Sequence, residues 1–220
     1  MDSITMTDQI RVAIAGYGSL GRGVETCLAQ NSDMELICVF SRRDSASVTL
    51  LDQKVPVYAM ADVEHYQDEV DVMILCGGSK TDLPEQGPHL TQFFNTVDSF
   101  DTHEKVNEYF AVLNGAAQKS GNIALLAVGW DPGLMSLNRL FGETILPERK
   151  TDTGTHSKQT IGCSLALGNN LEFTASVLVA YTRAVYRLAR SGEIGAKTVF
   201  DVAPGLLSPK SPSQLRKELL

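Results

Sequence analysis

No stretch of the 220-residue sequence approaches the ~20 consecutive apolar residues that a membrane-spanning helix needs. The opening residues, MDSITMTDQ, also lack the basic start and apolar core of a secretory signal. Cysteine is scarce and scattered, with no CxxC pair, which argues against a disulfide framework or a zinc site. We therefore expect a cytoplasmic protein without membrane contact or bound metal, whose cysteines are buried free thiols: Cys27, Cys38, Cys76 and Cys163.

Positive charge is also in short supply. The net charge of −7 argues against a general nucleic-acid partner. Residues 1–148 hold 9 Lys/Arg against 21 Asp/Glu, whereas residues 149–220 hold 10 against 5. The two segments could dock on each other, or the basic C-terminal helix could simply face water. We favour the second interpretation, because exposed charge is the norm.

Hydrophobic content of 43% and charged content of 20% are typical of a globular chain that is long enough to bury a sizeable core. Short β-branched apolar runs alternate with helical patterns along the first two thirds of the sequence. Such alternation implies parallel strands joined by helical crossovers, hence an α/β, Rossmann-like doubly wound sheet. The predicted strands are residues 9–16, 34–40, 55–60, 69–78, 93–100 and 121–130, and the predicted helices are residues 24–34, 102–117 and 132–146.

The pattern changes near residue 148. Residues 148–160 are polar and aperiodic, and residues 161–167 (IGCSLAL) could form an edge strand. Residues 172–192 then give the clearest helical pattern of the chain, with Gly192 as the expected C-cap, and residues 208–220 predict a short helix. We divide the chain into a nucleotide-binding domain (1–148), a linker with a truncated second domain (149–172), and C-terminal helices that pack on the first domain (173–220).

A GxGxxG motif follows the first predicted strand. It comprises Gly16, Tyr17, Gly18, Ser19, Leu20 and Gly21. At the start of a βαβ unit these glycines allow a tight turn, backbone approach to a pyrophosphate and close helix packing. The helix start supplies donors to the phosphates. The motif predicts dinucleotide binding; the alternative is a glycine-rich turn without a ligand.

The second predicted strand ends in Ser41, Arg42 and Arg43, where a protein that binds NAD normally carries a carboxylate. A guanidinium offers a planar pair of donors to a phosphate, and the serine adds a hydroxyl. The sequence therefore predicts NADP(H) as the cofactor. The alternative is a pair of solvated surface arginines.

Three later strand ends reach the same edge of the predicted sheet. Cys76, Gly77, Gly78 and Ser79 would leave bare backbone beside a nucleotide, although a simple tight turn would look the same. Asp98 and Asp101 end one strand, and Trp130 and Asp131 follow another. Asp101 and Asp131 could orient an ammonium group and accept its proton. Alternatively, Asp101 caps a helix and Asp131 closes a turn.

These motifs together resemble the meso-diaminopimelate dehydrogenase family. The resemblance rests on IRVAIAGYGSLGRGVE, FSRR, DVMILCGGSKTDLPEQ, TVDSFDTHEK, VGWDPGLMSLNR and the C-terminal segments NNLEFTASVLVAYTRAVYRLARSG and KTVFDVAPGLLSPKSPSQLRKELL. It implies a homodimeric, NADP-dependent oxidoreductase of lysine biosynthesis. The implied reaction is the reversible oxidative deamination of meso-2,6-diaminopimelate at its D-centre, which gives L-2-amino-6-oxopimelate and ammonia.

The resemblance also assigns residues to the two ligands. It implies substrate contacts from Asp101, Trp130, Asp131 and Asn170, with Asp101 and Asp131 as the catalytic pair. The cofactor contacts that it and the glycine motif imply are Gly16, Tyr17, Gly18, Ser19, Leu20, Gly21, Ser41, Arg42, Arg43, Cys76, Gly77, Gly78, Ser79, Ser99, Phe100, Asp101, Val128, Gly129, Trp130, Asp131 and Pro132.

The sequence departs from the family in length. Between Ile145–Glu148 and residue 151, family members carry the stretch that forms most of the substrate-binding and dimerisation domain. Three interpretations follow: an active dehydrogenase with a shortened substrate domain, an impaired deletion form that still binds NADP(H), or a Rossmann reductase for a smaller amino or keto acid. We expect residues 149–172 to pack poorly or to expose apolar surface.

Overall fold

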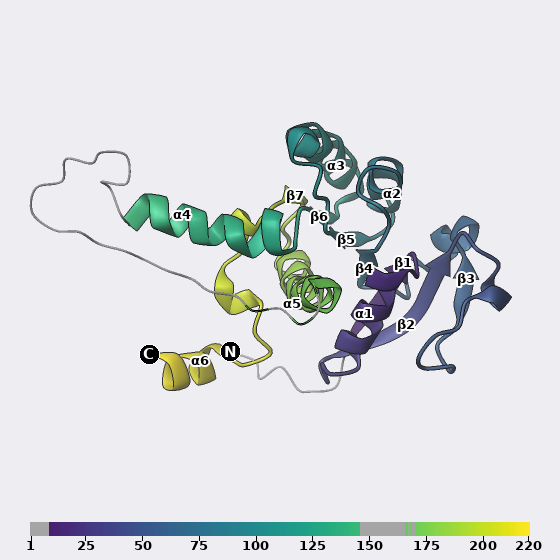
Figure 1. Cartoon of the computed structure of the whole chain (residues 1–220), viewed down its shortest axis with the longest axis horizontal. Coiled ribbons are helices and arrows are strands. Elements are labelled where there is room, and N and C mark those ends of the chain that lie inside the picture. The colour runs from purple at the N-terminus through teal and green to yellow at the C-terminus, as the bar shows by residue number, and fades with distance from the viewer. Residues whose placement is uncertain (1–8, 146–165, 167, 169) are drawn as a thin grey trace, which may run out of the picture.

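The structure is a computed structural model that describes residues 9–145, 166, 168 and 170–220. Its centre is a seven-stranded parallel sheet with the order β3-β2-β1-β4-β5-β6-β7 (Figure 1). The predicted doubly wound α/β fold is confirmed. The strands are β1 (Ile10–Ala15), β2 (Met34–Ser41), β3 (Val57–Ala59), β4 (Val72–Leu75), β5 (Asn95–Asp98), β6 (Ile123–Leu125) and β7 (Gly195–Lys197).

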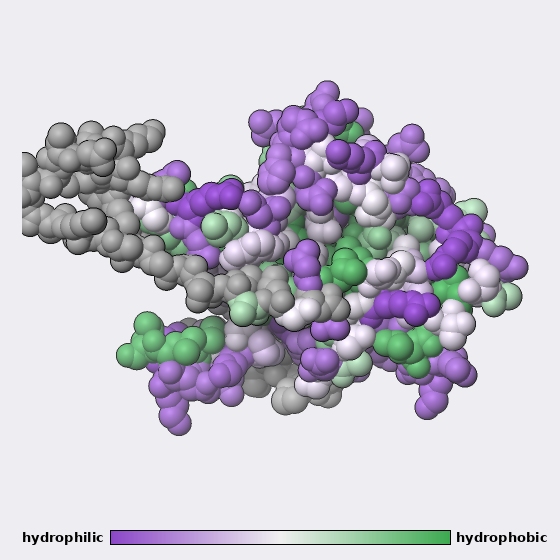
Figure 2. All heavy atoms as spheres, in the orientation of Figure 1, coloured by the Kyte–Doolittle hydropathy of each residue, from purple (hydrophilic) through white to green (hydrophobic). Residues whose placement is uncertain are grey.

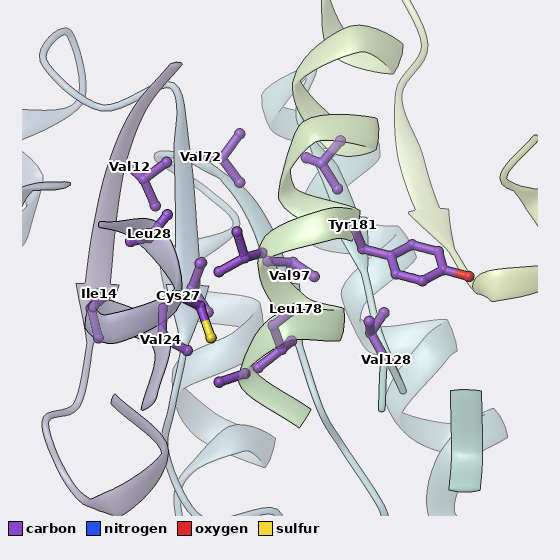
Figure 3. Close-up of a cluster of buried hydrophobic side chains, with 14 of the residues drawn as sticks. Val12, Ile14, Val24, Cys27, Leu28, Val72, Val97, Val128, Leu178 and Tyr181 are labelled. Carbon is purple, nitrogen blue, oxygen red and sulfur yellow. The ribbon is translucent and has the colours of Figure 1, made fainter. Parts of the chain in front are cut away.

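Helices cover both faces of this sheet. Helices α1 (Ser19–Leu28) and α5 (Asn170–Arg190) lie on one face, and α2 (Leu83–Leu90) and α3 (Val106–Ser120) lie on the other (Figure 1). Alternate residues of β1 enter the two cores, as the two-residue period of a strand requires. Val12 and Ile14 join the α1/α5 core, which Figure 3 shows together with Leu178, whereas the neighbouring alanines join the α2/α3 core.

Six of the strands coincide with predicted runs, but two elements were not predicted. Helix α2 follows the Gly77–Gly78 pair, and strand β7 pairs with β6 at the end of the sheet. The sequence does not predict strand β7, because its three residues, Gly195-Ala196-Lys197, show no apolar alternation. The C-terminal segment therefore extends the central sheet as well as covering it.

The C-terminal helices begin and end where capping residues allow. Gly192 has φ of +84°, which is the left-handed conformation expected after a helix end, and it confirms the predicted cap of α5. Helix α6 (Pro212–Leu219) begins after Ser211, whose side chain accepts a hydrogen bond from the backbone N–H of Gln214. Figure 2 shows hydrophobic residues gathered on the surface at α6. Leu219 and Leu220, at the end of this helix, are exposed.

We predicted that the basic C-terminal helix faces water, and this prediction is wrong for Arg183. This α5 side chain is only 2% exposed. Its guanidinium donates hydrogen bonds to both carboxylate oxygens of Asp33, and the bond to Oδ1 is 2.8 Å long. It also donates to Asn31 Oδ1 at 2.9 Å and to the Leu207 carbonyl oxygen at 2.7 Å. A buried charge requires such pairing. The basic segment thus docks on the acidic one at this point.

Helix α4 (Met135–Ile145) extends away from the sheet in Figure 1. The linker predicted at residues 148–160, most of the edge strand predicted at 161–167, and Cys163 lie outside the described residues. Of the other cysteines, Cys27 and Cys38 are buried free thiols as predicted, and Cys76 is half-buried. Among the helices that the structure describes, none combines the length and the apolar character needed to cross a bilayer.

Candidate active site

The glycine motif forms the turn between β1 and α1, at the edge of the sheet where the strands end. Gly16 has φ of +94°, a conformation that favours glycine. A Cβ atom on Gly21 would lie 2.5 Å from the Gly16 carbonyl oxygen, so only glycine lets α1 start this close to the strand. A Cβ on Gly18 would have no neighbour within 4 Å. The turn therefore has tight packing beneath it and open space above it, as a pyrophosphate requires.

Glu25 supports this turn and was not predicted. It is 4% exposed and accepts hydrogen bonds from the Tyr17 hydroxyl and from the backbone N–H groups of Leu51 (3.2 Å) and Asp52 (2.9 Å). Burial, together with this bond to Glu25, raises the pKa of Tyr17 to about 12, so Tyr17 remains a neutral donor. A signal existed in the sequence: Glu25 lies one helical turn after Gly21, on the buried face of α1.

The arginine pair contacts protein groups in this structure. Ser41 is buried at the end of β2, and its hydroxyl accepts a hydrogen bond from the Arg43 backbone N–H at 3.0 Å. The Arg43 guanidinium donates to the Tyr17 carbonyl, and Arg42 forms a 2.7 Å ion pair with Asp82. The two positive groups are therefore held beside the glycine turn, at the adenosine end of the predicted cofactor site.

Ser79 joins the ends of β4 and β5. The Cys76 carbonyl group packs against the glycine turn: a Cβ atom on Gly16 would lie 3.4 Å from it. The Ser79 hydroxyl accepts a 2.9 Å hydrogen bond from the Asp101 backbone N–H and lies 3.0 Å from the Thr102 hydroxyl. The structure thus brings three of the predicted segments, at residues 16, 76–79 and 101, into contact.

Asp98 plays the corresponding role between β5 and β6. It is 1% exposed and accepts hydrogen bonds from Phe100 N (2.9 Å), Ala127 N (3.3 Å) and the Tyr109 hydroxyl (2.8 Å). Burial raises the pKa of Asp98 to about 6. The residues that follow these two strand ends are Ser99–Asp101 and Val128–Pro132, so Asp98 supports two predicted cofactor segments at once.

The two carboxylates predicted to be catalytic have different surroundings. Asp101 is exposed, and it does not cap a helix: Thr102 occupies the N-cap of the next turn (His103–Lys105), where no side-chain cap bond forms. Asp131 is paired through both carboxylate oxygens with Arg139 of α4, at 2.7 and 3.1 Å. Arg139 was not predicted as a site residue, and its role is evident only in the folded chain.

The start of α5 lies against the tryptophan segment. The Trp130 ring contacts the Phe173 ring edge to face, with centroids 5.8 Å apart, and a Cβ on Gly129 would lie 3.8 Å from a Thr174 methyl group. Asn170, the predicted substrate ligand, is the exposed first residue of α5. The C-terminal segment thereby reaches the edge of the sheet that carries the other candidates.

Curated relatives align along nearly the whole chain. The Lysinibacillus sphaericus protein named meso-diaminopimelate D-dehydrogenase is 39% identical over 324 residues, with 96% of this chain and 99% of the relative covered. The protein of the same name from Ureibacillus thermosphaericus is also 39% identical, with the same coverage. This chain belongs to the meso-diaminopimelate D-dehydrogenase family. No protein-family model matches it.

Solved structures of dehydrogenases share this fold. A Clostridium tetani meso-diaminopimelate dehydrogenase mutant with diaminopimelate has a TM-score of 0.87 at 33% identity, with 96% of this chain and 100% of that chain covered. An engineered D-amino acid dehydrogenase bound to NADP⁺ has a TM-score of 0.84 at 29% identity, over 96% of this chain and 100% of that one.

The family alignment also reveals a difference in length. It extends over 324 residues, whereas this chain has 220, so more than a hundred residues of the Lysinibacillus sphaericus dehydrogenase have no counterpart here. This agrees with the predicted loss of a long internal stretch.

Proposed function

We propose that this chain binds NADP(H) and catalyses the reversible oxidative deamination of meso-2,6-diaminopimelate at its D-centre, as an enzyme of lysine biosynthesis. The products would be L-2-amino-6-oxopimelate and ammonia. One observation carries the proposal. In a member of the meso-diaminopimelate D-dehydrogenase family, an open glycine turn lies beside two arginines, at the same sheet edge as two candidate carboxylates.

The residues at the adenosine end fit NADP(H). The open space over Gly18 and the N-terminus of α1 would take the pyrophosphate, and Arg42 and Arg43 supply the positive charge that a ribose 2′-phosphate needs. Residues 41–43, at the end of β2, carry no carboxylate, whereas an NAD-binding protein would carry one there. Ser99–Asp101 and Val128–Pro132 would follow the cofactor toward its nicotinamide end.

At the substrate end, Asp101 and Asp131 would hold the substrate ammonium group. NADP⁺, when bound, supplies the acceptor for the hydride that leaves the substrate α-carbon. Loss of that hydride and of one N–H proton leaves a carbon–nitrogen double bond, to which water adds before ammonia departs. We assign Asp101 as the proton acceptor, because its carboxylate is exposed, whereas Asp131 is engaged by Arg139. Trp130 and Asn170 would line the same pocket.

The test is an absorbance assay of NADP⁺ reduction with the meso, LL and DD isomers of diaminopimelate. Only isomers with a D-centre should react, and meso should react fastest. Asp101→Asn should lower kcat by at least about 100-fold, which is the usual contribution of a positioned acid or base. Asp62→Asn is the control: it makes the same chemical change at an exposed residue that belongs to none of the candidate site segments.

The shorter length supports a second candidate, an NADP(H)-binding form with impaired turnover. Much of the rate of such a reaction comes from precise placement of the reacting carbon, and the missing stretch would otherwise help to close over the substrate. NADPH binding without turnover of any isomer would favour this second candidate. Failure to bind NADPH would overturn both.

A homodimer, expected from the family resemblance, and a cytoplasmic location, expected from the scattered cysteines, remain predictions. Light scattering during gel filtration would measure the first, and fractionation of cells would measure the second.

A further inference from the structure

The ion pair between Arg42 and Asp82 joins two loops that are far apart in sequence. Arg42 follows β2, and Asp82 immediately precedes α2, after the Gly77–Gly78 turn. The Arg42 Nη2 atom lies 2.7 Å from Asp82 Oδ1, and Asp82 Oδ2 accepts a 2.8 Å hydrogen bond from the Gly78 backbone N–H. Asp82 therefore uses one oxygen to fix its own loop and the other to hold Arg42.

The pair bridges two segments that follow the strands on either side of β1. Strands β2 and β4 flank β1 in the sheet, so these two strands lie about 10 Å apart, twice the usual strand spacing. The glycine turn at the end of β1 lies between them. An arginine side chain is long enough to bridge such a gap, and here it crosses the edge where the adenosine part of a dinucleotide would lie.

The two arginines are not equivalent in this respect. Arg43 donates to the Tyr17 carbonyl, a neutral group of the glycine turn itself. Arg42 is paired with a full negative charge, while 64% of its side chain remains exposed. An incoming phosphate would therefore have to compete with a carboxylate for Arg42 but not for Arg43.

We propose that Asp82 is a specificity-determining residue that competes with the ribose 2′-phosphate for the Arg42 guanidinium. The inference rests on the proposed binding of NADP(H). A phosphate dianion offers more charge and more acceptor oxygens than a carboxylate, so it displaces Asp82 and takes over the guanidinium. NADH has no such phosphate and gains nothing from Arg42. Asp82 thus weakens the binding of the phosphorylated cofactor and lowers its advantage over NADH.

The experiment measures the dissociation constants of NADPH and NADH for the wild type and for Asp82→Asn. Asparagine keeps an oxygen for the Gly78 N–H but loses the charge that holds Arg42. NADPH should bind about two- to five-fold more tightly, because an ion pair this exposed contributes little more, and NADH binding should not change. Glu85→Gln is the matched control, since it removes the same charge from the exposed first turn of α2.

A second variant tests the pair from its other end. In an Arg42→Ala background, Asp82→Asn should no longer affect NADPH binding, so the two changes should be non-additive. The inference is overturned if Asp82→Asn leaves NADPH binding unchanged, weakens it, or shifts NADPH and NADH equally. An equal gain from Glu85→Gln would likewise reduce the effect to general electrostatics.

The failure of the proposed function would look different. If the wild type does not prefer NADPH to NADH, the cofactor assignment falls, and this inference falls with it. If the wild type prefers NADPH but Asp82→Asn fails to strengthen that preference, only the inference is lost.

Discussion

Tyr109 donates a 2.8 Å hydrogen bond to Asp98, and both side chains are buried beneath the edge of the sheet that carries the site. The same carboxylate accepts backbone bonds from the segments after β5 and β6. The Asp98 side chain therefore aligns two loops that the proposed chemistry needs close together. Its protonation state should affect the free energy of unfolding.

Asp98 should make the fold less stable as the pH rises. Burial raises its pKa from 3.8 to about 6, so the folded chain binds this proton more tightly than the unfolded chain does. Its contribution to the free energy of unfolding is full below pH 4 and is lost as the pH rises through about 6. The loss should be up to about 3 kcal/mol.

Asp98→Asn removes that titration. Its amide oxygen can still accept from the backbone, and the Tyr109 hydroxyl can turn to accept from the amide nitrogen. Urea unfolding of both proteins at pH 4.5 and pH 7.5 should show the variant gaining stability relative to the wild type at the higher pH. An equal difference at the two pH values would contradict this assignment.

Substitutions at Gly21 and Gly18 should have different effects, the first on stability and the second on NADPH affinity. Gly21→Ala places a methyl group against the Gly16 carbonyl, so α1 must move, and overpacking of this kind costs about 1–3 kcal/mol. Gly18→Ala meets no protein atom and should leave the melting temperature unchanged while NADPH binding weakens at least about ten-fold, because the methyl group fills the space for the pyrophosphate. Thermal melting and NADPH titration measure the two effects. Normal NADPH affinity in Gly18→Ala would exclude the pyrophosphate from that space.

Glu25→Gln should loosen the loop around residues 50–52 and the glycine turn together. The carboxylate accepts three hydrogen bonds, whereas an amide turns an NH₂ group toward one of those donors. A buried N–H left without a partner costs about 1–3 kcal/mol, so the variant should unfold at lower urea concentration. NADPH affinity should fall as well, since Tyr17 and the Arg43 that contacts it would shift. Glu35→Gln, an exposed change on β2, should alter neither quantity.

Arg183→Met should destabilise the attachment of α5 to the sheet. The change removes the bonds to Asp33, Asn31 and the Leu207 carbonyl, and loss of hydrogen bonds to a charged group costs about 1.5–3 kcal/mol. Arg183 also lowers the pKa of Asp33, so stability from this pair is present above pH 4 and is lost in acid. Arg190→Met, an exposed change on the same helix, is the control. Equal melting temperatures for the two variants would show that the buried contacts add nothing.

The sequence by itself determined the order of the first six strands, the glycine turn and the arginine pair. These are local features: short, β-branched apolar runs favour buried strands, and a GxGxxG turn depends on residues that are adjacent along the chain. Even the place of Asp101 and Asp131 at the edge of the sheet followed from parallel strands that all end on one side.

Tertiary structure alone decided what those residues contact. Asp82 meets Arg42, Asp131 meets Arg139, and β7 extends the sheet only because the fold brings distant segments together. Arg183 shows the reason most clearly. Its place on α5 was evident from the sequence, but whether it faces water or a carboxylate depends on the loop before β2, and local periodicity contains no information about that neighbour.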